Sequence, residues 1–466
     1  MIAIGGTGMA PLACLLDRLG HRVRGSDGPL YPPMSTLLAD AGITPRVGFE
    51  PAHLEPPPDL VIVGNAVPRH NPQARATEER ELPRMSMPEA LGRFFLAGRR
   101  PLVVAGTHGK TTTTACASWV LTACGADPGY LIGGVPIGAD HSFRLGSGER
   151  FVIEGDEYNA SYFDRGPKFL HYRPHALILT SVEWDHADLY PEPERLLAAY
   201  RSLVELVPED GLIVACGDHP ELVELVHGAA KAPVVTYGLE PHNEVCPRDG
   251  IRADTAGSHF VIDDADGPVS IDLPVSGRHN VQNALAVWAV ARHDGHAAVD
   301  VAAALSSFRG VKRRLEVLGE VDGVTVIDDF AHHPTAVGVT LAALADRYPG
   351  RRRIALFEPR SLTAGRAFFF EAYREAFARA DVVLMAPIFH AGRLSDDERL
   401  DREALVGALV AAGVNAEACE SNDLLLERAL THARGGDVVV TMSSGSFEGM
   451  PRRVLEALGG RESGES

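Results

Sequence analysis

A glycine-rich segment with a single lysine is the strongest chemical signal in the sequence. The segment AGTHGKTTT, residues 105–113, follows the apolar run PLVV and precedes a helical pattern that ends near Gly125. Glycines let backbone N–H groups turn toward phosphate oxygens, and the start of a helix adds partial positive charge. The segment therefore predicts a nucleotide-phosphate loop in which Lys110 reaches the terminal phosphates and Thr111 binds Mg²⁺. An ordinary strand–turn–helix connection is the alternative.

Two features of this loop stand out. Lysine is scarce, since only four of the 44 Lys and Arg residues are lysines, and one of them is Lys110. The general phosphate-loop pattern has a glycine five residues before Gly109, whereas this chain has Val104 there. The sequence therefore indicates a loop shorter than that of most nucleotide-hydrolysing proteins.

Two carboxylate-rich segments follow apolar runs further along the chain. FVIEGDEY places Glu154 at the end of one predicted strand, and LILTSVEWDHAD places Glu183 and His186 after the next. Ligands of open parallel sheets bind beyond the carboxyl ends of the strands, so Thr111, Glu154 and His186 could face one phosphate-bound Mg²⁺. Because Mg²⁺ prefers oxygen ligands, the histidine indicates a second cation. A helix cap or a surface position is the alternative for His186.

Three later motifs each have two interpretations. In GRHNVQNALAV, Asn280 is a helix N-cap, which the residue types favour, or forms with Asn283 a polar pair that contacts a nucleotide. The KRR run at 312–314 is a solvated basic surface, or it supplies an arginine to ATP when domains close. VIDDFAHHPTA, which contains Asp329, could be a metal motif, but a helix starting at Pro334 is favoured because no cysteine supports zinc.

A second glycine-rich turn opens the sequence. GGTGMA, residues 5–10, follows the apolar run MIAI and precedes a helical pattern. Asp27 comes about 20 residues later, which completes a loose dinucleotide-type signature. Two nucleotide sites in one chain suggest that one nucleotide supplies energy and the other is attached to a substrate.

The elements that must position these residues alternate between strand and helix, the pattern of parallel α/β sheets. A chain of 466 residues is expected to form two or three domains. We predict α/β domains over residues 1–98, residues 99–310, which carry the phosphate loop, and residues 311–466.

The composition restricts the partners. The net charge of −18 disfavours nucleic acid or an anionic membrane, because both select clustered Lys and Arg. The six cysteines form no C-x-x-C pair, which fits a reducing compartment. No apolar run is long enough to span a membrane, and the first residues lack a signal-peptide pattern, so a cytoplasmic location is expected.

Taken together, the motifs resemble the Mur ligase family, the ATP-dependent amide-bond ligases of peptidoglycan synthesis. The short phosphate loop is the form that this family uses. The resemblance implies an N-terminal Rossmann-like UDP-binding domain, a central ATP-binding phosphate-loop domain and a C-terminal Rossmann-like domain. It runs over nearly the whole chain and rests on GGTGMA (5–10), AGTHGKTTT (105–113), EGDEYNASYFD (154–164), SVEWDHADLY (181–190), SGRHNVQNALA (276–286), KRRLEVLGE (312–320) and DDFAHHPTA (328–336).

The resemblance also implies roles for particular residues. The catalytic set is Lys110, Glu154 and His186, and the Mg²⁺ ligands are Thr111, Glu154 and His186. Arg314 and Asp329 would reach ATP from the third domain on closure. The expected UDP-sugar contacts are Gly5, Gly6, Gly8, Asp27 and Asn65. The expected ATP contacts are Gly106, Thr107, His108, Gly109, Lys110, Thr111, Thr112, Asn280, Asn283, Arg314 and Asp329.

Two kinds of family member look closest, and both act on UDP-N-acetylmuramate. One adds L-alanine, and the other adds the recycled tripeptide L-alanyl-γ-D-glutamyl-meso-diaminopimelate. YPPMSTLL (31–38), DEYNASYFD (156–164) and FEPRS (357–361) resemble the second kind, so the tripeptide is the expected acceptor and L-alanine the alternative. The chain departs from the family at Ala3, where glycine is usual. A phosphate-loop switch or motor and a nicotinamide-dependent dehydrogenase are the competing classes.

Overall fold

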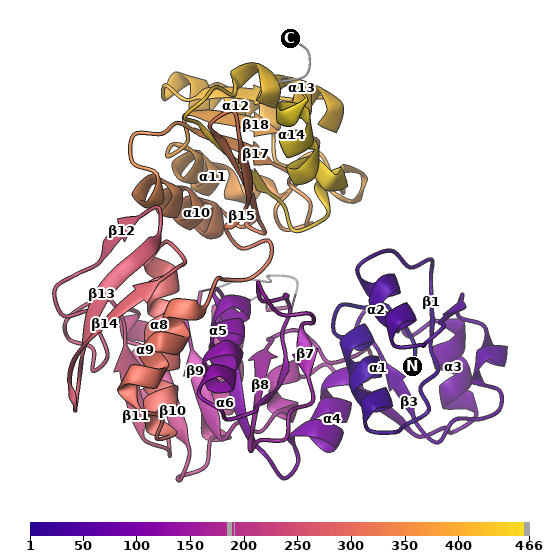
Figure 1. Ribbon diagram of the computed structural model, residues 1–466. Coiled ribbons are helices and arrows are strands. Elements are labelled where there is room, and N and C mark those ends of the chain that lie inside the picture. Colours follow the sequence, from indigo (N-terminus) through magenta and orange to yellow (C-terminus); the bar gives the residue numbers. More distant parts are fainter. Residues whose placement is uncertain (184–188, 191, 461–466) are drawn as a thin grey trace. The chain divides into compact units, whose positions relative to one another are not determined.

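The computed structural model describes residues 1–183, 189–190 and 192–460 (Figure 1). The chain divides into two compact units. Unit 1 comprises residues 1–248, 262–269 and 282–305, and unit 2 comprises residues 249–261, 270–281 and 306 onward. This division differs from the three predicted domains, whose bounds stay a prediction.

The first part of unit 1 contains a small parallel sheet with Ile2 at its centre. β1 (Ser26–Asp27) pairs with β2 (Arg46–Val47), and β3 (Val61–Val63) pairs with β4 (Arg84–Ser86). Ile2 forms parallel bridges to Ser26 and to Val63, so it joins the two pairs. The predicted first strand, MIAI, is therefore a bridge at Ile2. The helices of this part are α1 (Met9–Arg18), α2 (Met34–Asp40), α3 (Pro72–Glu79) and α4 (Met87–Leu91).

A seven-stranded sheet with β5 at its centre forms the rest of the unit 1 core. Its order is β11-β10-β9-β5-β8-β6-β7, and only the β6–β7 pair is antiparallel. β5, β8, β9 and β10 are nearly continuous apolar runs because parallel strands are buried on both faces. The strands are β5 (Arg100–Ala105), β6 (Gly129–Leu131), β7 (Phe143–Arg144), β8 (Arg150–Gly155), β9 (Ala176–Leu179), β10 (Leu212–Cys216) and β11 (Val234–Tyr237).

Five helices accompany or follow this sheet along the chain. They are α5 (Lys110–Ala123), α6 (Pro193–Glu205), α7 (Pro220–His227), α8 (Arg278–His293) and α9 (Ala298–Ser307). Three short strands, β12 (Arg252–Asp254), β13 (Gly257–Asp264) and β14 (Gly267–Leu273), form a separate sheet between α7 and α8 in the sequence. The division between the units runs through β13, β14 and α8.

The part of unit 2 from residue 306 onward is a six-stranded sheet with helices on both faces (Figure 1). Its order is β15-β16-β20-β17-β18-β19, and only β15 runs antiparallel to its neighbour. The strands are β15 (Glu316–Val321), β16 (Val324–Asp329), β17 (Arg353–Phe357), β18 (Val382–Met385), β19 (Asn415–Ala418) and β20 (Val438–Met442). The helices are α10 (Pro334–Arg347), α11 (Phe370–Phe377), α12 (Arg402–Ala411), α13 (Asn422–His432) and α14 (Met450–Gly459).

Alternating side chains of the unit 2 strands build two cores, as strand geometry requires. Phe357 packs with Leu341 of α10 and Tyr373 of α11 on one face. Leu356 packs with Val454 of α14 on the other face. Local signals start the helices as well, since Asp401 and Ser421 accept backbone N–H groups at the first turns of α12 and α13.

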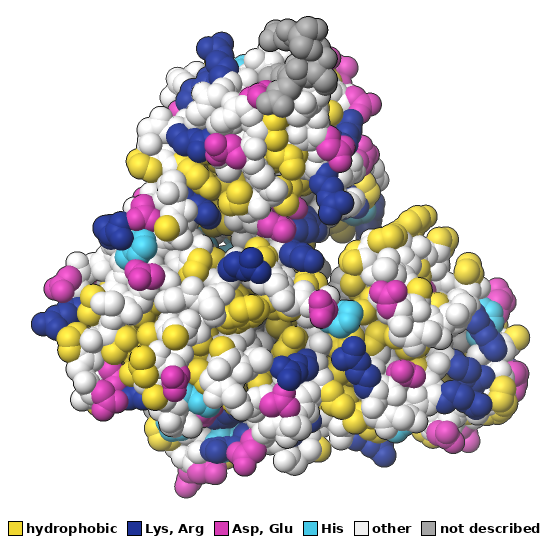
Figure 2. Space-filling view, in the orientation of Figure 1, with side chains coloured by type: hydrophobic (Ala, Val, Ile, Leu, Met, Phe, Trp, Pro, Cys, Tyr) yellow, Lys and Arg dark blue, Asp and Glu magenta, His cyan; other side chains and the backbone are white. Residues whose placement is uncertain are grey.

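Charge is spread over the surface. On the face shown in Figure 2, Lys and Arg side chains are interspersed with Asp and Glu side chains.

Among the described residues, no helix combines the length and the apolar character that a membrane crossing needs.

Candidate active site

The phosphate loop connects β5 to α5, as the sequence predicts. Gly106 has a φ of 136°, and Gly109, directly before α5, has a φ of 80°. A Cβ on Gly106 would lie 2.1 Å from Thr180 Oγ1 and 2.8 Å from the backbone nitrogen of Ser181. Gly109 is therefore required by its left-handed backbone, and Gly106 also by the close approach of the chain after β9.

Thr107 and His108 complete the loop and are held by the segment after β9. The Thr107 hydroxyl accepts the backbone N–H of Glu183 at 2.8 Å and donates to the Glu183 carbonyl at 3.0 Å. His108 Nε2 lies 3.1 Å from Glu183 Oε2, and the His108 backbone N–H donates to Ser181 Oγ at 3.2 Å. Thr112 follows in the first turn of α5 and is half-buried. The predicted loop residues thus form one contiguous site.

Lys110 begins α5, and its ammonium group lies among carboxylates. Nζ donates to the Gly106 carbonyl at 2.6 Å and to Glu157 Oε2 at 3.1 Å. Only 13% of the Lys110 side chain and 3% of the Glu157 side chain are exposed. Burial acts to lower the pKa of Lys110, but the carboxylates of Glu157, Asp156 and Glu154 together outweigh it and raise that pKa above its ordinary value. The lysine is therefore held protonated beside the loop.

Thr111 and Glu154 form the oxygen pair predicted for Mg²⁺. Thr111 Oγ1 donates to Glu154 Oε2 at 3.0 Å, and the backbone N–H of Gly133 donates to Glu154 Oε1. Burial, and then the charge of Asp156, raise the pKa of Glu154. Two adjacent oxygen ligands fit a hard divalent cation, which would bind between them in place of their hydrogen bond. The third predicted ligand, His186, lies outside the described residues. Among the residues that the structure describes, no three His, Cys, Asp or Glu side chains form a metal cluster.

The two predicted asparagines have different surroundings. A Cβ on Gly109 would lie 3.0 Å from Asn283 Oδ1, so Asn283 is beside the phosphate loop. The N-cap interpretation of Asn280 is wrong, because α8 begins two residues earlier, at Arg278. The Asn280 amide instead donates to the Ser276 carbonyl at 2.8 Å.

Arg314 and Asp329 lie close to each other in unit 2. The Arg314 guanidinium lies 4.7 Å from the centroid of the Phe330 ring, and Arg314 is half-buried, whereas Lys312 of the same basic run is exposed. Asp329 is buried and accepts the backbone N–H groups of Leu315 at 2.6 Å and Ala331 at 2.8 Å. Burial raises the pKa of Asp329, while the charge of Arg314 opposes that shift.

The helix start predicted in the same motif is confirmed. α10 begins at Pro334, and His333 Nδ1 accepts the backbone N–H of Thr335 at 3.3 Å. His333 is therefore the N-cap of this helix, which the sequence analysis did not predict.

The predicted UDP-sugar residues gather at the carboxyl edge of the first sheet. The Gly5 backbone N–H donates to Asp27 Oδ2 at 2.7 Å, and Gly6 and Gly8 follow in the turn before α1. Asn65 is exposed and stands two residues beyond β3. Ala3 has a φ of 60°, a left-handed conformation that explains why glycine is usual there.

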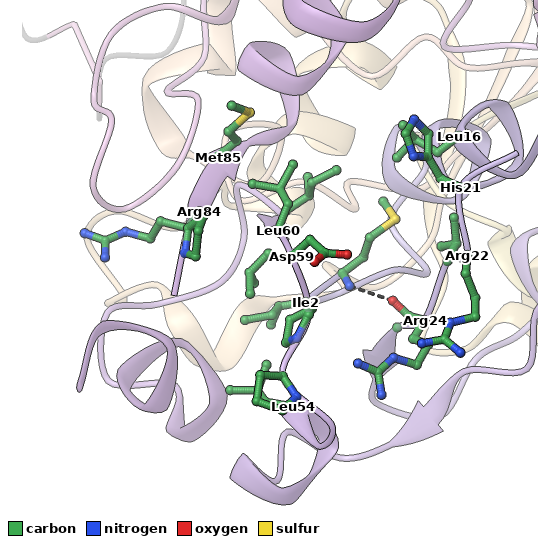
Figure 3. Close-up of a pocket in the computed structure, with 18 of the residues that line it drawn as sticks. Ile2, Leu16, His21, Arg22, Arg24, Leu54, Asp59, Leu60, Arg84 and Met85 are labelled. Carbon is green, nitrogen blue, oxygen red and sulfur yellow. Dashed lines mark hydrogen bonds between the residues drawn. The ribbon is translucent and has the colours of Figure 1, made fainter. Parts of the chain in front are cut away.

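A cavity of about 670 Å³ lies at the opposite edge of this sheet (Figure 3). Its lining includes Ile2, Arg24, Leu60 and Arg84, which stand at or before the strand starts. The Met1 amino group donates to the Arg24 carbonyl there at 2.6 Å. The predicted UDP-sugar residues do not line the cavity. We therefore do not assign the cavity to the nucleotide chemistry.

Glu157 was not among the residues predicted from the sequence. It stands three residues after Glu154 in EGDEY, so the sequence signal was the shared carboxylate-rich segment. Chain position alone did not separate Glu157 from Asp156, which instead accepts Lys168 Nζ at 3.1 Å.

Three family descriptions match successive parts of the chain. The Mur ligase family catalytic domain matches residues 1–99, the Mur ligase middle domain matches residues 104–291, and the Mur ligase glutamate ligase domain matches residues 313–445. These matches confirm the predicted three-part Mur ligase architecture.

Individual relatives match over nearly their full length. UDP-N-acetylmuramate–L-alanyl-γ-D-glutamyl-meso-2,6-diaminoheptandioate ligase of Escherichia coli (strain K12) is 40% identical, covering 98% of this chain and 97% of that protein. UDP-N-acetylmuramate–L-alanine ligase of Burkholderia multivorans is 35% identical, covering 98% and 97%. The crystal structure of a murein peptide ligase from Psychrobacter arcticus 273-4 is similar with a TM-score of 0.73 and 35% identity over 98% of both chains. The chain therefore belongs to the Mur ligase family of ATP-dependent ligases.

Proposed function

We propose that this ligase joins UDP-N-acetylmuramate to the tripeptide L-alanyl-γ-D-glutamyl-meso-diaminopimelate, with conversion of ATP to ADP and phosphate. The observation that carries the proposal is the 40% identity, over 98% of the chain, to the Escherichia coli ligase named for that tripeptide. The alanine-adding ligase of Burkholderia multivorans is 35% identical, which makes L-alanine the second candidate acceptor. Because ATP and UDP-linked sugars are cytoplasmic metabolites, we place the reaction in the cytoplasm.

The proposed chemistry activates a carboxylate. A lactyl carboxylate oxygen of UDP-N-acetylmuramate attacks the γ-phosphorus of ATP, and the bond from this phosphorus to the bridging oxygen breaks, releasing ADP. The peptide amine, after loss of a proton, attacks the acyl carbon of the resulting acyl phosphate. Inorganic phosphate leaves, and an amide remains. Negative charge accumulates throughout, so positioning and electrostatics supply most of the catalysis.

The loop residues receive roles that match their positions. Lys110, protonated at the start of α5, neutralises the transferring phosphoryl group. Thr111 Oγ1 and the Glu154 carboxylate, which are in contact, would hold Mg²⁺, and His186 is proposed to bind a second ion. The metal supplies positive charge next to the phosphates when bound. Asn283, beside Gly109, is proposed to contact ATP.

The remaining roles concern residues of the first sheet and of unit 2. Gly5, Gly6, Gly8, Asp27 and Asn65 are proposed to bind the UDP part, since they share the carboxyl edge of the first sheet. In unit 2, Asn280, Arg314 and Asp329 are proposed to contact ATP. Water exclusion is required because an acyl phosphate hydrolyses readily.

A substrate comparison tests the proposal directly. The full chain is incubated with ATP, Mg²⁺ and UDP-N-acetylmuramate, together with either L-alanine or the tripeptide, and the UDP-linked product is quantified. We expect product with the tripeptide and much less with L-alanine. Product with L-alanine alone would overturn the tripeptide assignment and leave the alanine ligase. Hydrolysis of ATP that is independent of UDP-N-acetylmuramate would favour a phosphate-loop switch or motor.

Two lysine variants test the catalytic assignment. Lys110→Ala is expected to abolish ligation. Lys231→Ala is the matched control, because Lys231 is exposed and its ammonium group donates to the Glu205 backbone carbonyl at 3.1 Å. Full turnover by Lys110→Ala would remove the loop from the mechanism.

A further inference from the structure

The carboxylate of Glu157 forms an ion pair with the phosphate-loop lysine. Lys110 Nζ lies 3.1 Å from Glu157 Oε2 and 3.5 Å from Oε1. The same Nζ donates to the Gly106 carbonyl at 2.6 Å, so the ammonium group is fixed between the loop backbone and this carboxylate. Both side chains are almost completely buried, which makes the interaction of their charges strong.

Three acidic residues lie at or just after the end of β8, and each has a different partner. Glu154 accepts the Thr111 hydroxyl at 3.0 Å, and Asp156 accepts Lys168 Nζ at 3.1 Å. Glu157 faces Lys110. Its main chain is held as well, since the Tyr190 hydroxyl donates to the Glu157 carbonyl at 2.6 Å. The carboxylate therefore has a defined position and is not a mobile surface group.

We propose that Glu157 is a positioning residue that holds the Lys110 ammonium group at the phosphate loop and competes with the ATP phosphates for it. The proposal rests on the proposed role of Lys110 in binding ATP. A phosphate group that contacts Nζ comes within a few ångströms of the Glu157 carboxylate, and these two anions repel each other in a buried site. Glu157 thus weakens nucleotide binding while keeping Lys110 in place for phosphoryl transfer.

The two effects of Glu157 separate binding from turnover. Glu157→Gln keeps the shape and the hydrogen-bond acceptor but removes the charge. ATP no longer meets an opposing carboxylate and binds more tightly. Lys110 is held less firmly, so the phosphoryl group is positioned less well and kcat falls. A residue that only stabilised the fold would not move these two quantities in opposite directions.

The test measures the dissociation constant of ATP by calorimetry on the full chain with Mg²⁺, and kcat in the complete assay. For Glu157→Gln we expect the dissociation constant to fall about 3- to 10-fold and kcat to fall about 10-fold. Glu157→Asp retains the charge one methylene group further away, so its ATP dissociation constant should lie between those of the wild type and Glu157→Gln. Asp164→Asn is the matched control, because this carboxylate in the same segment contacts His171 Nε2 at 2.7 Å, and its ATP affinity should equal that of the wild type.

Unchanged or weaker ATP binding by Glu157→Gln would overturn the proposal. If Glu157→Gln does not fold, the ATP dissociation constant of Glu157→Asp becomes the test. If Glu157→Asp binds ATP no more tightly than the wild type, Glu157 does not compete with ATP for Lys110. The proposed function fails by a different result: either the wild type does not bind ATP, or Lys110→Ala binds it as well as the wild type.

Discussion

Removing the loop lysine should destabilise the protein as well as inactivate it. Lys110→Met leaves the Glu157 carboxylate, whose side chain is 3% exposed, without the ammonium group 3.1 Å away. Removing one partner of a buried ion pair costs about 3–5 kcal/mol of unfolding free energy. The double variant Lys110→Met/Glu157→Gln removes both charges of this pair. It should therefore regain most of the lost stability while staying inactive.

Protonation of Glu157 limits the size of this loss. A carboxylate that has lost this ammonium group can take up a proton, which at pH 7 costs about 3.7 kcal/mol for a glutamate with an ordinary pKa of about 4.3. The loss in Lys110→Met should therefore be about 3–4 kcal/mol at pH 7. At pH 5 the same proton costs only about 1 kcal/mol, so the loss should shrink. The sign follows because the folded variant binds this proton more tightly than the unfolded chain does, and acid therefore favours the folded variant.

Urea unfolding of the wild type, the two single variants and the double variant measures these differences. Tryptophan fluorescence is a suitable signal, because Trp119 lies in α5, the helix that begins at Lys110. The four midpoints form a double-mutant cycle whose coupling term isolates the Lys110–Glu157 pair. A loss below about 1 kcal/mol in Lys110→Met, or a double variant as unstable as that single variant, would refute the reasoning.

Three other substitutions have defined outcomes. Gly106→Ala places a Cβ 2.1 Å from Thr180 Oγ1, so the loop must shift. We expect steady-state kinetics to show at least a 100-fold loss of kcat/KM for ATP. Near-wild-type activity would contradict the geometry. Glu154→Gln should raise the Mg²⁺ concentration for half-maximal activity about 10-fold or more in a magnesium titration, and an unchanged value would remove Glu154 from the metal site. Arg150→Met removes the guanidinium whose Nε–H donates to Asp294 Oδ2 at 2.9 Å. In urea denaturation it should lower the unfolding free energy by about 3–5 kcal/mol. A loss below about 1 kcal/mol would show that this pair contributes little to stability.

Much of the fold follows from local patterns. Burial on both faces makes strands such as β9 and β18 continuous apolar runs, which are recognisable without a partner strand. The phosphate loop is likewise a local device, because Gly106, Gly109 and Lys110 act through backbone geometry and one helix start.

Element ends were less predictable. The helix that contains Asn280 begins at Arg278, so the residue expected to cap it lies inside the first turn. Several residues near a helix start can satisfy its free N–H groups, and tertiary packing selects among them. The first strand was reduced to a bridge at Ile2 for a related reason, since its pairing with Ser26 and Val63 depends on distant segments.

The sequence by itself determined which chemical groups are present and the order in which they follow strands. It placed Lys110 and Thr111 after β5 and three acidic residues at and after the end of β8. Only the tertiary structure decided that Glu154 meets Thr111, Asp156 meets Lys168 and Glu157 meets Lys110. These pairings join segments 12 to 47 residues apart, and they depend on the pairing of β5 with β8 and on the direction of each side chain beyond the strand end. Residue types and spacing do not encode those directions, because strand alternation no longer holds once the strand has ended.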